Sequence, residues 1–205
     1  ESGVELIDLE AWSKTPKDDR CLISLQATEL RLRSKISLQG APVFMGCSSS
    51  LAGIFKINGH LGKVSTGGQT DFYLTRDCPI VRPRSSHPIF SGIERLVCNR
   101  PGYIPEAFVN SRFAGYEIVR YPPVAPLAQQ HAFAVISPKL KFACVADDLL
   151  FSNQMLFKGD NLPFANNVIR WVTDDFKRKK VLFVVDNQVQ SPIDPSDLAF
   201  DPNAE

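Results

Sequence analysis

The feature that most constrains the fold of this chain is a set of short, unbroken apolar runs. They read CLISL (21–25), PVFM (42–45) and KFACVA (141–146). A strand that is buried on both faces does not alternate polar with apolar residues, and such strands occur in parallel sheets covered by helices on both sides. The order of strand, helix and strand favours parallel pairing through right-handed crossovers. We therefore predict an α/β fold with a mostly parallel central sheet flanked by helices.

Other segments extend this prediction at the start and in the middle of the chain. VELIDL (4–9) fits a first strand that is followed by a polar connector, and the segment 27–40 fits an amphipathic helix that ends at Gly40. Two further apolar runs, HAFAVIS (131–137) and LKFACVA (140–146), are separated only by a tight Ser-Pro turn. This hairpin predicts an antiparallel extension beside the parallel strands.

The final helix has the clearest pattern. Gly159 permits a turn, and Asp160 or Asn161 is a residue of the kind that caps a helix N-terminus. The spacing i, i+3, i+4, i+7 then places one apolar face on the helix. The residues on that face are Ala165, Val168, Ile169 and Val172. A strand, KVLFVV (180–185), is expected to follow.

Length and composition indicate one folded unit. The 205 residues include 44% apolar and 22% charged side chains, which is typical of a globular protein with a real core. We expect a single domain over 1–190 and an Asp- and Pro-rich, poorly ordered tail over 191–205. The opening, ESGVELIDL, reads as though an earlier element of the fold preceded it.

The charge balance argues against nucleic acid as a partner. Lys and Arg number 23 and Asp and Glu number 22, so the net charge is only +1. We interpret the densest basic stretch, KRKK (177–180), as a solvated loop between a helix and a strand. No apolar run approaches the roughly 20 residues that span a bilayer, so any membrane association is expected only through segments outside this chain.

Cysteine and histidine suggest one candidate nucleophile. Cys47 lies in GCSSS (46–50), a turn between a strand and a helix, where a thiolate would gain from the helix dipole. A nucleophile elbow reads G-x-C-x-G or G-x-S-x-G, and the sequence departs from that pattern. His60, His87 and His131 are the alternatives for its base. The five cysteines form no C-x-x-C pair, so we expect free thiols and no metal site.

A second candidate is a polar cluster that follows the run KFACVA. Its oxygen-bearing side chains could hold a divalent cation or a small polar ligand, since ligands of open parallel sheets bind beyond the carboxyl ends of the strands. The alternative interpretation is a structural corner, because Asp and Asn also form turns and caps. The cluster consists of Asp147, Asp148, Asn153, Asp160 and Asn161.

The segment KFACVADDLLFSNQMLFKGDNLPFANNVIRWV and the following KVLFVVDNQVQ together resemble the end of a glutamine-amidotransferase-like α/β domain. This family of unknown function occurs in bacteria such as planctomycetes, and its fold is flavodoxin-like. It is similar to the N-terminal domain of an intraflagellar-transport subunit and to a gliding-motility transporter component, which implies binding or assembly. The positions that carry the resemblance are Asp147, Phe151, Asn153, Met155, Asp160, Asn161 and Trp171-Val172.

These observations favour a non-enzymatic interaction or scaffold domain of a larger, membrane-associated protein, with a protein partner and no cofactor. One alternative is a cysteine-nucleophile amidase or amidotransferase-like enzyme that uses Cys47. Another is binding of a small ligand or divalent cation at the corner 147–161. The Pro-rich region 79–126 is a candidate binding surface, because irregular loops on a rigid sheet commonly carry binding residues.

Overall fold

A computed structural model of the chain describes residues 3–25, 40–47, 79–99, 101–105, 115–122, 131–137, 141–186 and 188–191. Three features of the sequence analysis lie outside these residues: the serines at 48–50, His60 and the tail from residue 192. The helix predicted at 27–40 also lies outside them, except for Gly40.

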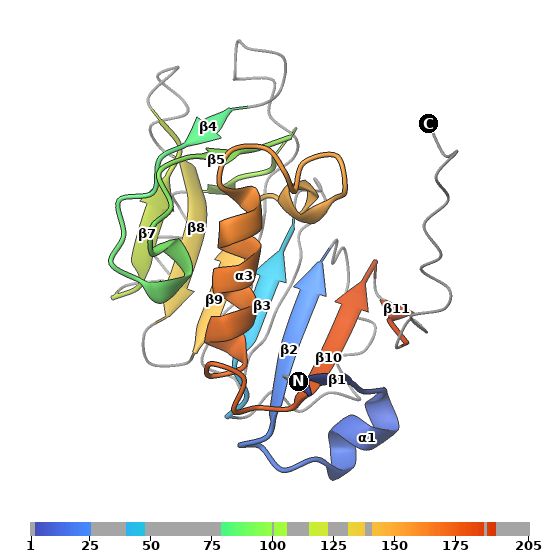
Figure 1. The fold of residues 1–205 in the computed structure, drawn as a ribbon. Helices are drawn as coiled ribbons and strands as arrows, with labels where there is room; N and C mark the ends of the chain where they lie inside the picture. The colour runs from blue at the N-terminus through green and yellow to red at the C-terminus, as the bar shows by residue number, and fades with distance from the viewer. Residues whose placement is uncertain are drawn as a thin grey trace, which may run out of the picture.

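The described residues form one nine-stranded mixed sheet and a separate two-stranded sheet (Figure 1). In the large sheet the order is β1, β10, β2, β3, β9, β8, β6; β11 also pairs with β10, and β7 with β8. The first five of these strands run parallel, and β6, β7, β8 and β11 pair antiparallel with their neighbours. The predicted α/β fold with an antiparallel extension is confirmed. The bounds are β1 Glu5–Leu6, β2 Arg20–Leu25, β3 Val43–Gly46, β6 Ile104–Pro105, β7 Glu117–Arg120, β8 His131–Ser137, β9 Phe142–Val145, β10 Lys180–Val185 and β11 Gln188–Val189.

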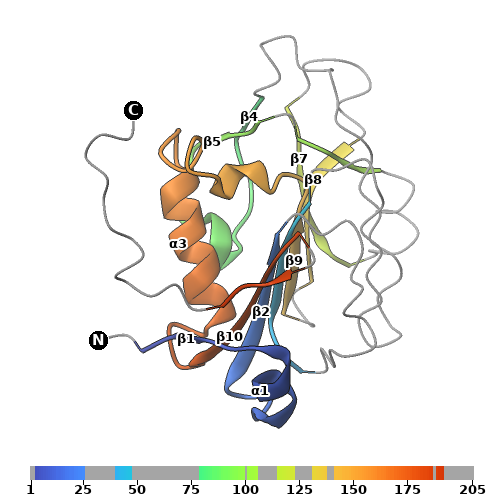
Figure 2. The same ribbon diagram turned by 90° about the vertical axis from the view of Figure 1, so that its right-hand side faces the viewer.

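The central strands are buried on both faces, as their unbroken apolar runs predict. All four residues of β3 and all four of β9 are buried. One apolar cluster, with Trp12 and Met45, lies on one face of the sheet, and a second, with Phe44 and Phe164, lies on the other. Figure 2 shows helix α3 (Asn161–Val172) beside the sheet, where it packs onto the second cluster.

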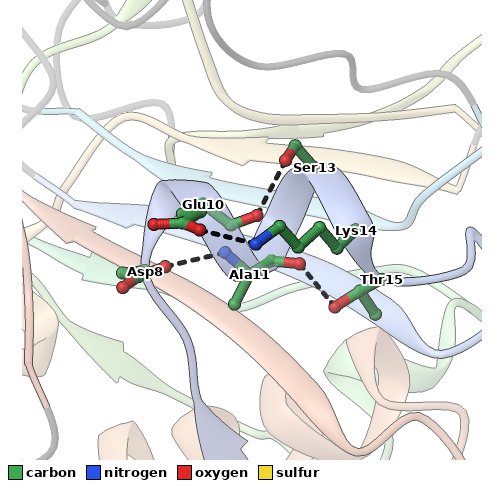
Figure 3. A network of polar contacts seen from close by, with 6 residues as sticks. All are labelled: Asp8, Glu10, Ala11, Ser13, Lys14 and Thr15. Carbon is green, nitrogen blue, oxygen red and sulfur yellow. Dashed lines mark hydrogen bonds and ion pairs between the residues drawn. The ribbon is translucent and has the colours of Figure 1, made fainter.

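The start of the chain differs from the prediction of one strand over 4–9. Only β1 is a strand, and α1 (Leu9–Lys14) follows at once. The carboxylate of Asp8 accepts a hydrogen bond from the Ala11 N–H at 2.8 Å, which satisfies one of the free donors of the first turn (Figure 3). Glu10 pairs with Lys14 one turn later, and Trp12 is buried against the sheet. A side-chain cap and one buried ring hold a helix of only six residues.

The final helix forms where its period predicts, but its apolar face is shifted. Val168 and Val172 are buried as expected, and Phe164 joins them. Ile169 remains 38% exposed and Ala165 is half-buried. The buried stripe therefore runs along one side of the predicted face, and the other side is left partly open.

The basic stretch after α3 is not simply a solvated loop. Lys177 and Lys179 are exposed, but Arg178 is buried, and its guanidinium donates to the carbonyls of Lys17 at 2.6 Å and Arg20 at 3.3 Å. A buried guanidinium needs such acceptors, because it carries five N–H donors and its charge is costly to desolvate. Arg178 therefore anchors the turn to the segment before β2.

The remaining elements support the antiparallel half of the sheet. The hairpin of β8 and β9 forms as predicted. A strand pair, β4 (Ile80–Val81) with β5 (Leu96–Val97), and a 3-10 helix, η2 (Pro88–Phe90), belong to the Pro-rich region, and η2 packs on α3. None of the helices in the described ranges has the length and apolar character needed to cross a bilayer.

Candidate functional site

The polar corner begins where β9 ends, as the sequence indicates. We use this name for Asp147, Asp148, Asn153, Asp160 and Asn161. A short 3-10 helix, η4 (Leu149–Phe151), and a turn containing Gly159 connect the two ends of the corner and lead into α3.

Asp147 is fully buried, and both of its carboxylate oxygens are engaged by backbone donors. One oxygen accepts from the Leu149 N–H at 2.9 Å and the other from the Asn99 N–H at 2.9 Å. Burial raises the pKa of this carboxyl to about 7, although the two backbone hydrogen bonds act in the opposite direction, and the neighbouring charge of Asp148 adds to the increase. Desolvation is the dominant effect because no solvent reaches the group.

Asp160 and Asn161 do not act as the helix caps that their positions predict. Asp160 stands at the N-cap of α3 without a capping hydrogen bond from its side chain. Its carboxylate instead accepts from the N–H groups of Glu94 at 2.9 Å and Arg95 at 2.8 Å. The Asp160 side chain therefore faces a segment more than 60 residues earlier in the chain.

Asn161 is fully buried, and its side chain makes three hydrogen bonds with the backbone. Its amide oxygen accepts from the Val97 N–H at 3.0 Å, and its amide nitrogen donates to the carbonyls of Val97 at 3.0 Å and Met155 at 2.8 Å. The Asn161 amide bonds with both the N–H and the carbonyl of Val97, as a residue of a neighbouring antiparallel strand would. This side chain thus extends the hydrogen-bonding pattern of β5 at an edge where the described ranges place no further strand.

Asp148 and Asn153 differ in their exposure. Asp148 is 6% exposed and lies against Gly46, where a Cβ atom would come within 3.2 Å of the Asp148 Cα. Asn153 is exposed. Among the residues that the structure describes, no group of three or more His, Cys, Asp or Glu side chains is arranged to hold a metal ion.

The corner as a whole grips the segment 94–99 along its length. Asp160 binds its start, Asn161 its middle and Asp147 its end, and Gly159 bridges to Leu96. Gly159 has a positive φ of 52°, and a Cβ there would lie 2.9 Å from the Arg95 carbonyl oxygen. Both carboxylate oxygens of Asp147, Oδ2 of Asp160 and the amide oxygen of Asn161 are thus occupied by N–H groups of the chain itself.

Cys47 follows β3, and its environment opposes thiolate formation. The residue is 2% exposed, and contact with the Cys144 thiol together with burial raises the pKa of the Cys47 thiol well above its usual value. Activated cysteines have the reverse property, a lowered pKa in a partly exposed electropositive site. The four cysteines within the described ranges are all free, as expected: Cys21, Cys47, Cys98 and Cys144.

The described structure does not bring Cys47 together with a histidine base. His87 caps η2, and its ring meets Trp171 of α3 edge-on at 5.1 Å, on the face opposite the cluster that contains Cys47. Burial lowers the pKa of His87. His131 begins β8, where its backbone pairs with Pro105, and nothing is described of its side chain. His60 lies outside the described residues.

An apolar groove beside α3 is the surface feature that sequence patterns did not reveal. It is a hollow of about 420 Å³ over β1, β10 and β2, and Figure 1 shows these strands beside α3 without a described helix in front of them. A run of apolar residues predicts a buried strand equally well whether or not a helix covers it. The groove is lined by Val4, Leu6, Ile23, Leu25, Phe44, Phe151, Leu156, Ala165, Val168, Ile169, Val181 and Phe183.

Comparisons of the chain with protein-family models, with curated proteins and with solved structures give no match. Functional inference therefore rests on the chain's own residues.

Proposed function

We propose that this protein is a non-enzymatic interaction domain of a larger protein and that its apolar groove binds an amphipathic helix of a protein partner. The observation that carries the proposal is the groove itself, whose described lining is formed entirely by apolar side chains. Extended apolar surface that water can reach is uncommon in a soluble domain and usually marks a binding surface.

The dimensions of the groove fit one helix. Its floor is made of three adjacent strands, whose outer axes lie roughly 10 Å apart at about 4.8 Å per strand. That width matches the diameter of about 10 Å of an α-helix with side chains. The floor residues span about three positions on each strand, or roughly 10 Å, which is close to two helical turns. The fit favours a partner with apolar residues at i, i+3, i+4 and i+7.

One wall of the groove is already presented by α3. Ile169 lines the groove and is 38% exposed, and Leu156 lines it from the turn before the helix. Phe157, the next residue, is 76% exposed at this end of the molecule. A partner helix laid beside α3 would restore the layer of helices that an α/β sheet needs on each face.

The two alternative functions receive less support from the geometry. A nucleophilic Cys47 would need to lose its proton in an environment that raises its pKa. A ligand at the polar corner would have to displace backbone N–H groups from Asp147 and Asn161 and from one carboxylate oxygen of Asp160. The resemblance to amidotransferase-like domains that bind or assemble points in the same direction, by analogy.

The test uses a photo-crosslinking amino acid at position 169 in the full chain, expressed in its own cells, with position 177 as the control on an exposed turn. We expect position 169 to cross-link to one protein at an amphipathic helical segment. That segment, synthesised as a peptide, is then titrated into the purified chain. Substitution of Ile169→Asp should weaken the peptide's Kd at least about tenfold, because a charge would be buried against apolar side chains.

The matched control is Leu162→Asp. Leu162 is on the same helix and is 36% exposed, but it does not line the groove. This variant should leave the Kd within about twofold, as expected for a surface substitution outside the contact. The proposal would be overturned if Ile169→Asp and Leu162→Asp weakened peptide binding equally. It would also be overturned if positions 169 and 177 cross-linked to the same segment. Cross-links to a second copy of this chain would replace the partner with self-association.

A further inference from the structure

A second hollow, of about 470 Å³, lies within the Pro-rich region, at the edge strand β7. Its volume falls in the range of about 300–1,000 Å³ that is typical of small-molecule sites. Its lining comes from β7, the two residues after β7 and the segment that follows β4, and Figure 1 shows the course of these parts of the backbone. The described residues that line it are Arg82, Arg84, Ile118, Val119, Arg120, Tyr121 and Pro122.

The hollow concentrates positive charge in a chain that is almost neutral. Three of its seven described lining residues are arginines, and none of the seven is Asp or Glu. Arg82 and Arg84 are exposed, and neither forms an ion pair with a carboxylate in the described ranges. They are two residues apart, with Pro83 between them, and both line the hollow.

Other arginines of the chain are used differently. Arg20 and Arg178 are buried and donate to backbone carbonyls, and Arg170 pairs with Asp175. Arg20 and Arg178 thereby hold buried segments of the fold together, whereas the pair of Arg170 and Asp175 is exposed and contributes little to stability. The guanidinium groups of Arg82 and Arg84 have no such structural task among the described residues, so their charge is available to an anion from solution.

The apolar part of the hollow is fixed by the sheet. Tyr121 is buried, its hydroxyl donates to the Gly102 carbonyl at 2.8 Å, and its ring meets that of Phe133 edge-on at 5.5 Å. The pairing of β7 with β8 shifts between Val119 and Arg120, and such irregularities re-aim side chains at sheet edges. Arg120 follows this irregularity and also lines the hollow, but it already interacts with another group of the chain.

We propose that this hollow binds an organic phosphate monoester, whose phosphate is held by Arg82 and Arg84 and whose organic part rests on Ile118, Tyr121 and Pro122. Guanidinium groups bind phosphate oxygens through pairs of parallel N–H donors. A phosphate monoester carries close to two negative charges at neutral pH, so it suits two guanidinium groups better than a carboxylate with one charge does. This site is separate from the apolar groove, and its existence does not depend on the proposed function.

The test is calorimetric titration of the full chain with inorganic phosphate, phenyl phosphate and a short phosphoserine peptide. We expect saturable binding of phenyl phosphate at millimolar concentration or below, tighter than that of inorganic phosphate, because only the ester covers the apolar wall. The third probe distinguishes the source of the phosphate. Tighter binding of the peptide assigns the site to a phosphorylated protein, and tighter binding of phenyl phosphate assigns it to a small ester.

The variants separate a site from general attraction of anions. Arg82→Gln with Arg84→Gln should weaken phenyl phosphate binding at least about tenfold, and the double Lys variant of the same positions should recover only part of the loss, because lysine lacks the planar fork. The control, Lys177→Gln with Lys179→Gln, removes the same charge from an exposed turn outside the hollow. Equal weakening by the Gln variants at both places, or no saturation by any probe, would overturn the proposal. Circular dichroism confirms that each variant is folded.

Discussion

The polar corner and the apolar groove have opposite relations to their surroundings. In the corner, the side chains of Asp147 and Asn161 are buried and form hydrogen bonds with the backbone of the same chain. In the groove, Ile169 and Phe183 are apolar, yet both remain partly exposed to solvent. The region that has the composition of a binding site is closed, and the region that has the composition of a core is open.

A partner is therefore expected to bind where apolar surface is still in contact with water, and not where polar side chains have already completed their hydrogen bonds. A polar group whose hydrogen bonds are complete gains little from a ligand and loses existing bonds to it. An apolar surface in contact with water gains free energy from any fitting partner, at roughly 25 cal/mol per Å² buried. The corner should therefore respond to substitution through stability, and the groove through binding.

The largest effect is expected from Asn161→Ala. The substitution leaves the Val97 N–H and the carbonyls of Val97 and Met155 without their partner in a fully buried position. Each unsatisfied buried group costs about 1–3 kcal/mol, so the free energy of unfolding should fall by ~5 kcal/mol. Urea denaturation measures this loss.

Asn153→Ala is the control for that substitution. Asn153 belongs to the same corner but is exposed, and its removal should change the free energy of unfolding by less than ~0.5 kcal/mol. Similar losses from the two variants would show that the corner's stability does not depend on the buried contacts with segment 94–99.

The second prediction concerns pH and Asp147. Its pKa is about 7 in the folded protein against 3.8 for the unperturbed group, so the folded state favours the protonated carboxyl. The associated stability is fully present below about pH 4 and is lost as the pH rises through about 7, a decrease of roughly 4 kcal/mol for a shift of about three pKa units. Denaturation of the wild type and of Asp147→Asn across this range measures it.

Asp147→Asn is the reference for the wild type, because its amide does not titrate in this pH range. It also loses one of the two backbone hydrogen bonds, since an NH₂ group faces one of the N–H donors of Asn99 or Leu149. Any advantage of the wild type should therefore shrink as the pH rises from 4 to 8. An advantage that grows with pH would mean that the backbone bonds outweigh desolvation and that the carboxylate is the favoured form.

A third, smaller effect is expected from Gly159→Ala. The residue has φ +52°, and the new Cβ would meet the Arg95 carbonyl oxygen and the Val97 side chain, both at 2.9 Å. Strain in the left-handed region costs about 1 kcal/mol, and displacement of the gripped strand adds a similar or larger amount, for a total of ~3 kcal/mol. Thermal denaturation provides the measurement.

Gly92→Ala separates the cost of backbone strain from the cost of the steric contact. Gly92 has φ +70°, but a Cβ there would meet nothing within 4 Å. It should therefore cost only the ~1 kcal/mol of backbone strain. Equal losses at the two glycines would show that the turn at 159 yields to the added methyl group and that the corner is less rigid than its contacts indicate.

Local sequence patterns predicted the elements of the fold well, because those elements depend on neighbours in the chain. The runs CLISL, PVFM and KFACVA became parallel strands, and the period around Val168 became α3. The helix α1 was missed, since six residues are too few to display a period, although Asp8 is a recognisable cap. Fold class is thus encoded redundantly in many short segments.

The candidate site was located by sequence but not explained by it. Asp160 and Asn161 were identified as polar residues at a helix start, yet their partners, Arg95 and Val97, lie more than 60 residues away. The burial of Arg178 depends in the same way on the carbonyls of Lys17 and Arg20. Contacts of this range follow from the sheet order, which places distant segments together, and no local spacing encodes them.

The smallest effect on stability is expected for a substitution in the groove wall that α3 forms. Ile169→Ser removes an apolar side chain that is 38% exposed, so the free energy of unfolding should change by less than ~1 kcal/mol. Val168→Ser, one position earlier, removes a side chain that is 2% exposed and belongs to the core cluster, and it should cost about 2–4 kcal/mol. Urea titration of both variants gives the contrast. If Ile169→Ser were as costly as Val168→Ser, this side of α3 would belong to the core, and the groove would be a packed region instead of an open binding surface.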